Sequence, residues 1–201
     1  MADREGAPPR AWQRMLSGRR LDLLEPSPLD VEIADIAHGL ARVARWNGQT
    51  IGAHAFSVAQ HSIAVEQIFS TLYPEAPPEH RLYALLHDAP EYVIGDMISP
   101  FKSVMGGSYR DVEGRLETAI NLRFQLPGIV PLPLKKKVKR ADLICAYFEA
   151  TELAGFSKTE GAKLFGKPSK LDGSGLALDC IPAGEAEARF LARFTVLNAA
   201  I

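Results

Sequence analysis

The segment Leu85-Leu86-His87-Asp88-Ala89-Pro90-Glu91-Tyr92-Val93-Ile94-Gly95-Asp96 joins an apolar run to a dense group of ionisable side chains. A histidine and an aspartate stand side by side after the apolar residues, and two more carboxylates follow within eight positions. Ionisable groups at the end of a buried helix lose hydration energy unless a partner neutralises them. A bound cation is the simplest partner, so this segment predicts a metal site with further ligands elsewhere in the chain.

The composition is that of an ordinary globular protein, with 201 residues, 47% hydrophobic and 23% charged, and a formal net charge of -1. A near-neutral chain argues against nucleic acid polymers and membrane surfaces as partners. Only two cysteines occur, Cys145 and Cys180, and they do not have CxxC spacing, which excludes a disulfide framework and a thiolate zinc site. The sequence has no apolar leader and no run of membrane-spanning length, so we expect a cytoplasmic protein.

Apolar residues recur at helical spacing, and no strand-like alternation of any length occurs, so the sequence predicts an all-α fold. The expected helices cover about residues 29–46, 57–72, 79–89, a segment starting near 108, 134–154 and 185–201. Pro90 lacks an N–H group, and the chain should therefore kink or restart there. On a continuous helix, Glu91 would lie on the same side as His87 and Asp88.

The expected organisation is one helical core with flanking segments. Residues 1–29, rich in Pro, Gly and Arg, form an N-terminal arm with a short turn of helix near residues 12–16. Residues 30–154 form the core, and residues 155–182 form a loop excursion rich in Gly, Ser and Lys. Residues 183–201 form a C-terminal helix that packs on the core.

A second histidine belongs to a buried helix face. Ser57 and Gln60 match a capping box, which predicts a helix start at Ser57 and places His61 on the apolar stripe of the first turn. Taken alone, a histidine in such a place is more often a hydrogen-bonded core residue than a metal ligand.

Asp142 is the matching anomaly in the 134–154 helix, where it interrupts an apolar stripe. A lone carboxylate there is costly unless it is paired or ligates a metal. One divalent ion, which could be Mn, Co, Fe, Mg or Zn, would account for His61, His87, Asp88 and Asp142 together.

Two other features have alternative interpretations. Arg45 and Trp46 stand at the predicted end of the first helix, where a cation is favoured by the helix dipole; the alternative is an anion-binding arginine braced by an aromatic ring. The basic run at residues 135–140 resembles a nucleic-acid patch, but it has no interleaved aromatics and fits a solvated helix face better.

The ordered set His61, Leu86-His87-Asp88-Ala89-Pro90-Glu91 and Ala141-Asp142 resembles the H…HD…D signature of the HD-domain metal-dependent phosphohydrolases, an all-α superfamily. The closer similarity is to its bacterial 5′-deoxynucleotidase-like branch, over about residues 30–154. That branch has an HDxxE segment followed by GD, a proline and a lysine, and an upstream Arg-Trp pair, which correspond to Glu91, Gly95-Asp96, Pro100, Lys102 and Arg45-Trp46.

The resemblance implies a role for each matching residue. The ligands of one divalent metal ion would be His61, His87, Asp88 and Asp142. Arg45 would hold a phosphate, with Trp46 and Lys102 as further substrate-binding residues. Glu91 would act on the attacking water, and Asp96 would lie near the sugar or a second water.

The implied function is a phosphomonoesterase that releases inorganic phosphate from (deoxy)nucleoside 5′-monophosphates. One alternative is hydrolysis of another phosphate ester or anhydride, such as a nucleoside triphosphate or a cyclic phosphodiester. Another is a non-catalytic nucleotide-sensing HD module, although the intact ligand set and Glu91 argue against it. The expected partner is a small phosphate ester, and a homodimer is possible.

Overall fold

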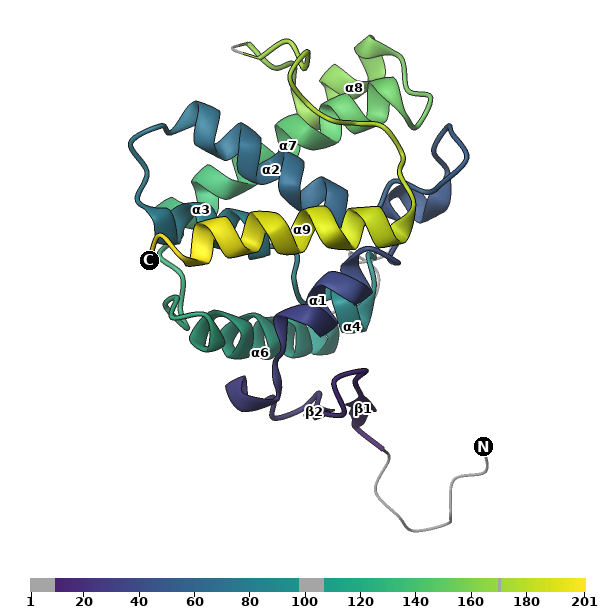
Figure 1. Ribbon diagram of the computed structural model, residues 1–201. Helices are drawn as coiled ribbons and strands as arrows, with labels where there is room; N and C mark the ends of the chain where they lie inside the picture. The colour runs from purple at the N-terminus through teal and green to yellow at the C-terminus, as the bar shows by residue number, and fades with distance from the viewer. Residues whose placement is uncertain (1–9, 98–106, 170) are drawn as a thin grey trace.

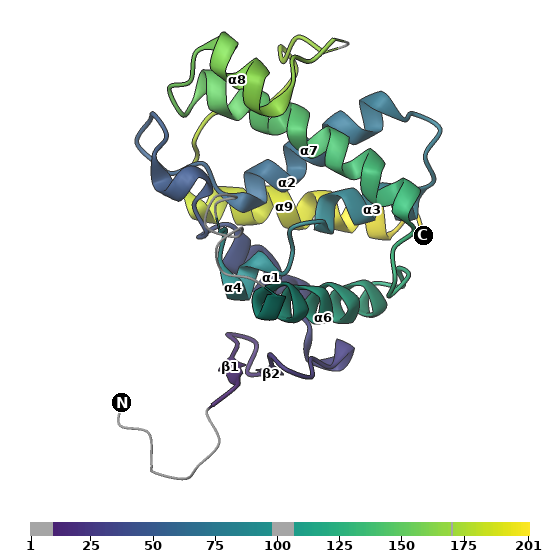
Figure 2. The ribbon, with the colours of Figure 1, turned by 180° about the vertical axis from the view of Figure 1, so that it is seen from behind.

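The computed structural model describes residues 10–97, 107–169 and 171–201 (Figures 1 and 2). The fold is mostly helical, which confirms the predicted class. The elements, in chain order, are β1 (Trp12–Arg14), β2 (Arg20–Asp22), η1 (Pro28–Asp30), α1 (Ile33–Leu40), η2 (Arg45–Gly48), α2 (Val58–Leu72), α3 (Pro78–Leu86), α4 (Glu91–Ile94), α6 (Gly107–Arg123), α7 (Leu132–Glu152), α8 (Lys158–Phe165) and α9 (Ala183–Asn198). Within these described ranges, no helix is both long and apolar enough to cross a membrane.

Helix α2 is the centre of the larger helical layer and packs against α3, α7 and α9. Figures 1 and 2 show it between α9 on one side and α7 on the other. Its start confirms the predicted capping box: Gln60 N donates to Ser57 Oγ at 3.3 Å, and Ser57 N donates to Gln60 Oε1 at 3.4 Å. This start turns His61 fully into the interior.

A buried carboxylate on α2 joins three helices. Glu66 is fully buried and accepts from Arg193 Nε of α9 at 2.6 Å and from Arg81 Nε of α3 at 3.2 Å. The side chain of Phe190 packs into the core from the same face of α9. The C-terminal helix is therefore held on α2 by both apolar burial and charge-assisted hydrogen bonds.

Helices α1, α4 and α6 form a second group below this layer (Figure 1). Helix α3 ends at Leu86, and the chain restarts as α4 directly after Pro90, as the proline predicts. Helices α1 and α4 touch at Gly39, where an added Cβ would lie 2.8 Å from both the Cβ and the carbonyl oxygen of Tyr92. Only glycine permits this approach, which sets the position of α4 and of Glu91 at its start.

The first helix is shorter than the sequence predicts. Helix α1 ends at Leu40, whereas the pattern favoured a helix to about residue 46. Val58 N donates to Val43 O at 2.9 Å, and Arg45 N donates to Phe56 O at 2.8 Å, so residues 43–45 pair with the approach to α2. Long-range backbone pairing therefore overrides the local helical pattern here.

The N-terminal arm also differs from the prediction. Residues 12–16, expected as a helical turn, contribute to a hairpin in which β1 and β2 run antiparallel and Gln13 faces Leu21. Leu21 is fully buried, and the hairpin turn is tied to α1 because Ser17 donates from its N and Oγ to the buried Asp35 carboxylate. Three-residue strands are too short for alternation to reveal them.

The segment 155–182 was expected to be a loop, but it contains α8. Ser157 and Glu160 form a second capping box, with Ser157 Oγ accepting from Glu160 N at 3.2 Å. The Gly- and Lys-rich composition hid this start signal. Gly161 of α8 lies against Tyr147 and Thr151 of α7, which holds α8 on the long helix.

The Gly39 contact leads to a stability prediction. Gly39→Ala should destabilise the protein by about 1–3 kcal/mol, the usual cost of overpacking, because Tyr92 backbone and Cβ atoms block the new methyl group. Gly114→Ala is the matched control: Gly114 lies within α6 with nothing within 4 Å of an added Cβ, so this change should stabilise by up to about 1 kcal/mol. Urea unfolding of both variants measures the difference, and equal effects would contradict it.

Candidate metal centre

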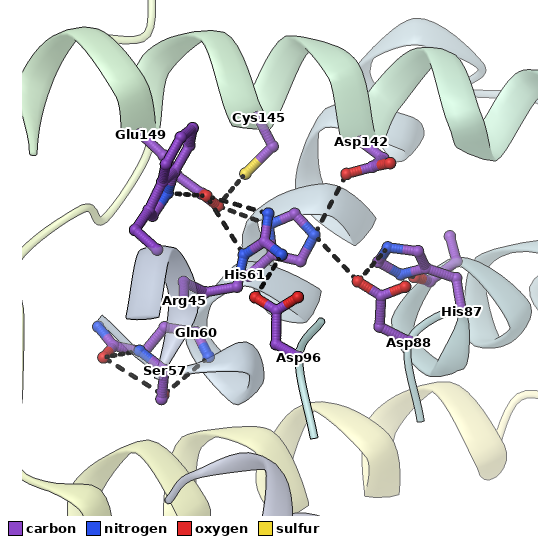
Figure 3. A network of polar contacts seen from close by, with 12 residues as sticks. Arg45, Ser57, Gln60, His61, His87, Asp88, Asp96, Asp142, Cys145 and Glu149 are labelled. Atoms are coloured by element: carbon purple, nitrogen blue, oxygen red, sulfur yellow. Dashed lines mark hydrogen bonds and ion pairs between the residues drawn. The ribbon is translucent and has the colours of Figure 1, made fainter. Parts of the chain in front are cut away.

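Two imidazoles and two carboxylates from α2, α7 and the turn after α3 converge in the interior (Figure 3). His61 Nε2 lies 3.4 Å from Asp88 Oδ2 and 3.4 Å from Asp142 Oδ1. His87 Nε2 lies 3.2 Å from the same Asp88 oxygen. The structure therefore brings together all four residues that the sequence selected.

The spacing of these atoms fits ligands that share one cation. Two ligand atoms at about 2.1 Å from an ion lie about 3.0 Å apart in octahedral geometry and about 3.4 Å apart in tetrahedral geometry. Ligand atoms of His61, His87 and Asp88 all lie within 4.8 Å of one another. Within the described residues, neither buried Nε2 atom has a hydrogen-bond partner, which is what nitrogens directed at a metal would show.

The opposite nitrogen of each ring is engaged by an acceptor. His87 Nδ1 lies 2.9 Å from the carbonyl oxygen of Ala84, and His61 Nδ1 lies 2.5 Å from Glu149 Oε1. A carbonyl oxygen can only accept, so His87 carries its hydrogen on Nδ1, and the Glu149 carboxylate favours the same form of His61. Both Nε2 lone pairs are then available to a cation.

The two aspartates are held in their anionic form. Burial opposes the charge on Asp88, but His87 and His61 outweigh it and hold the pKa of this carboxyl well below its usual range. Burial also opposes the charge on Asp142, yet His61 again lowers its pKa. On the solvent side, Lys139 Nζ lies 2.6 Å from Asp142 Oδ2. Anionic oxygens beside imidazole nitrogens suit a borderline or hard divalent ion.

Arg45 lies directly beside this group and is only 14% exposed. Its Nη1 lies 2.9 Å from Asp96 Oδ2, and its Nη2 lies 3.3 Å from Glu149 Oε2. Burial works against its charge, but Glu149 and Asp96 raise the pKa of the guanidinium. Because α1 ends five residues earlier, at Leu40, a helix dipole does not explain this arginine. The alternative interpretation, an anion-binding arginine braced by an aromatic ring, stays a prediction.

Trp46 has an unusual backbone conformation, with φ 57° and ψ 27° in the left-handed region. Such a conformation costs about 1–3 kcal/mol for a residue other than glycine and persists only where the surroundings impose it. The indole Nε1 donates to Glu149 Oε2 at 2.8 Å, and the ring contacts Phe156 and Phe165 at centroid distances of 5.6 and 5.9 Å. Helix α8 therefore supports the site through Trp46.

Glu149 is the site residue that sequence reasoning missed. It is fully buried, and its Oε1 also accepts from Cys145 Sγ at 3.3 Å. Burial would raise the pKa of its carboxyl, but its contacts with His61 and Arg45 outweigh burial and lower it to about 2. The missed signal is its spacing: Glu149 follows Asp142 by seven residues, so both lie on one face of α7.

The remaining predicted residues lie as follows. Glu91 is buried at the first position of α4, three residues after Asp88. Asp96 faces Arg45, as described. Lys102 and the neighbouring Pro100 lie outside the described residues. The lysines and arginine of the basic run are exposed on α7, as predicted.

Comparison with known proteins gives concordant results. The model of a family described as 5′-deoxynucleotidase YfbR-like matches residues 34–163. This range includes α2, α3, α7 and most of α8. An uncharacterized protein of Rhodobacter capsulatus is 55% identical over 188 residues, or 94% of this chain and 96% of that protein. The uncharacterized protein YfdR of Escherichia coli is 32% identical over 124 residues, or 62% of each chain. The chain therefore belongs to the YfbR-like 5′-deoxynucleotidase family of the HD-domain superfamily.

Proposed function

We propose that this protein is a metal-dependent phosphomonoesterase that releases inorganic phosphate from (deoxy)nucleoside 5′-monophosphates. The proposal rests mainly on one observation: among the described residues, two imidazole nitrogens without hydrogen-bond partners and two anionic aspartates converge beside a buried arginine. The family's description as 5′-deoxynucleotidase-like supports a nucleotide substrate.

His61, His87, Asp88 and Asp142 would hold one divalent ion, as is typical of the HD family. The mixed nitrogen and oxygen set is compatible with Mn, Co, Fe, Mg or Zn. When bound, such an ion would supply Lewis-acid polarisation of a phosphoryl oxygen and would lower the pKa of a water.

Arg45 would bind the phosphate. Its planar guanidinium can donate two parallel hydrogen bonds to non-bridging oxygens, where negative charge accumulates in the transition state. Glu149 pairs with Nη2 of the Arg45 guanidinium, and Asp96 pairs with Nη1. The incoming phosphate would displace Asp96 from Nη1, or Asp96 would contact the sugar or a second water. Trp46 would line the same subsite, and Lys102 would support the phosphate.

Glu91 would orient the attacking water and accept its proton. Water oxygen attacks phosphorus, the bond from phosphorus to the 5′ oxygen breaks, and the leaving nucleoside oxygen takes up a proton. The products are a nucleoside and inorganic phosphate. Burial of Glu91 at the start of α4 excludes bulk water from this carboxyl group.

A single phosphate suits the charges at the site better than a polyphosphate does. Among the described residues, the basic side chains in contact with the acidic members of the group are Arg45 and Lys139. A triphosphate would need more cationic groups to offset its charge.

The central test is phosphate release from a panel of nucleoside and deoxynucleoside 5′-monophosphates with Mn²⁺, Co²⁺ or Mg²⁺. We expect hydrolysis that a chelator abolishes and the added ion restores. Glu91→Gln should lower kcat by about 100-fold or more, the usual scale for a lost general base, with the metal content unchanged. No release from any mononucleotide with any of these ions would contradict the proposal.

The ligand assignment has its own test. Asp88→Ala should weaken binding of Mn²⁺ by at least about 100-fold, since it removes a direct ligand and even supporting residues cost 10- to 100-fold. Hydrolysis should fall with it. Calorimetric titration measures the affinity, and circular dichroism confirms folding. A folded Asp88→Ala variant with the metal content of the wild type would remove Asp88 from the site.

Arg45→Lys tests the phosphate role while preserving the charge that balances Asp96 and Glu149. Lysine cannot form the two-pronged contact, so inorganic phosphate should bind the metal-loaded variant about 10-fold more weakly, with the metal affinity retained. Arg42→Lys is the matched control, because Arg42 lies on the surface and pairs with Glu187. Equal phosphate affinity in the two variants would argue against Arg45 as the phosphate ligand.

A further inference from the structure

The carboxylate of Glu149 is surrounded by donors on both edges. Its Oε1 faces His61 Nδ1 and Cys145 Sγ, and its Oε2 faces Trp46 Nε1 at 2.8 Å and Arg45 Nη2 at 3.3 Å. The side chain is fully buried. Figure 3 shows it on the far side of the His61 ring from Asp88 and Asp142.

We propose that Glu149 is a positioning residue that holds His61 with Nε2 directed at the metal, and that Arg45 and Trp46 hold Glu149 in place. The inference rests on the metal site of the proposed function and adds a residue to it. Glu149 touches neither the proposed metal nor the phosphate; it acts through the imidazole.

Geometry supports this role because one helix carries both Glu149 and the ligand Asp142. A helix rises about 1.5 Å per residue, so the seven-residue separation places the Cα atoms of Asp142 and Glu149 about 10 Å apart on one face of α7, and both side chains reach toward the space between them. The His61 ring, supplied by α2, fits between them, with Nδ1 toward Glu149 and Nε2 toward Asp142. The ring therefore has a single orientation that satisfies both contacts.

The side chain at position 149 must accept hydrogen bonds at both of its terminal atoms, as the two oxygens of a carboxylate do. Glutamine has the shape of glutamate but offers one oxygen and one NH2 group. Arg45 and Trp46 provide the stronger donors and would take the oxygen. The NH2 group would then face His61 Nδ1, which favours the ring form with its hydrogen on Nε2, and that hydrogen blocks the metal-facing nitrogen.

The test compares Glu149→Gln with Glu66→Gln. Glu66 is a matched control because it is equally buried, lies on α2 and binds two arginines, Arg81 and Arg193, away from the metal group. Both variants are checked for folding by denaturant unfolding. Mn²⁺ is then titrated into each variant and into the wild type by calorimetry.

Glu149→Gln should weaken Mn²⁺ binding by about 10- to 100-fold, the usual effect of losing the partner of a metal-bound histidine. Glu66→Gln should lose stability but keep the Mn²⁺ affinity of the wild type. A folded Glu149→Gln variant with wild-type Mn²⁺ affinity would overturn the inference, as would an equal loss in both variants.

A measurement on the wild type decides the matter if Glu149→Gln fails to fold. Nitrogen-15 spectra of the Zn²⁺-loaded, histidine-labelled protein report which ring nitrogen carries hydrogen. We expect His61 with hydrogen on Nδ1 and the metal on Nε2. Metal on Nδ1, or no hydrogen there, would contradict the proposed role of Glu149.

These readouts separate the inference from the proposed function, because they measure metal binding rather than turnover. If Glu149→Gln weakens Mn²⁺ binding but the wild type hydrolyses no mononucleotide, the inference stands and the proposed function fails. If the wild type hydrolyses mononucleotides and Glu149→Gln binds Mn²⁺ with wild-type affinity, the proposed function stands and the inference about Glu149 fails. A wild type that binds no divalent ion would overturn both.

Discussion

The buried contact between His61 and Glu149 joins the two helices that build the site. His61 belongs to α2 and Glu149 to α7, and both side chains are completely removed from solvent. The contact lowers the cost of burying both groups, because an unpaired buried charge or ring nitrogen is costly. The packing of α2 against α7 is therefore a condition of the site as well as of the core, and Arg45 joins the same network from η2.

The charge balance around this contact favours a cation. Among the described residues, four carboxylates, Asp88, Asp96, Asp142 and Glu149, surround a region where Arg45 is the buried basic side chain. Lys139 offsets part of the charge of Asp142 from the exposed side. A divalent ion would neutralise much of the remainder, and because the unfolded chain lacks this arrangement, binding would also stabilise the fold.

Local signals in the sequence were sufficient for much of the fold. The Ser57 capping box predicted the start of α2, and Pro90 predicted the break before α4; the structure confirms both. The all-α class followed from helical spacing. Helix α1 ended early because residues 43–45 pair with the approach to α2, a contact between segments that no local pattern reveals. Helix α8 was missed because its start signal lies in a Gly- and Lys-rich stretch. The hairpin was missed because its strands are only three residues long.

For the candidate site, residue chemistry in the sequence singled out His61, His87, Asp88 and Asp142, because ionisable groups on apolar helix faces need a common partner. From its position alone, the sequence favoured a helix-end cation for Arg45, and the structure does not support that because α1 ends at Leu40. The distances among these groups, the hydrogen on Nδ1 of each ring and the role of Glu149 depended on how α2, α3 and α7 pack. A glutamate near a helix end looks like an ordinary solvated residue in a sequence. Its spacing from Asp142 places it on the same face of α7, but its burial between His61, Trp46 and Arg45 is what makes it part of the site.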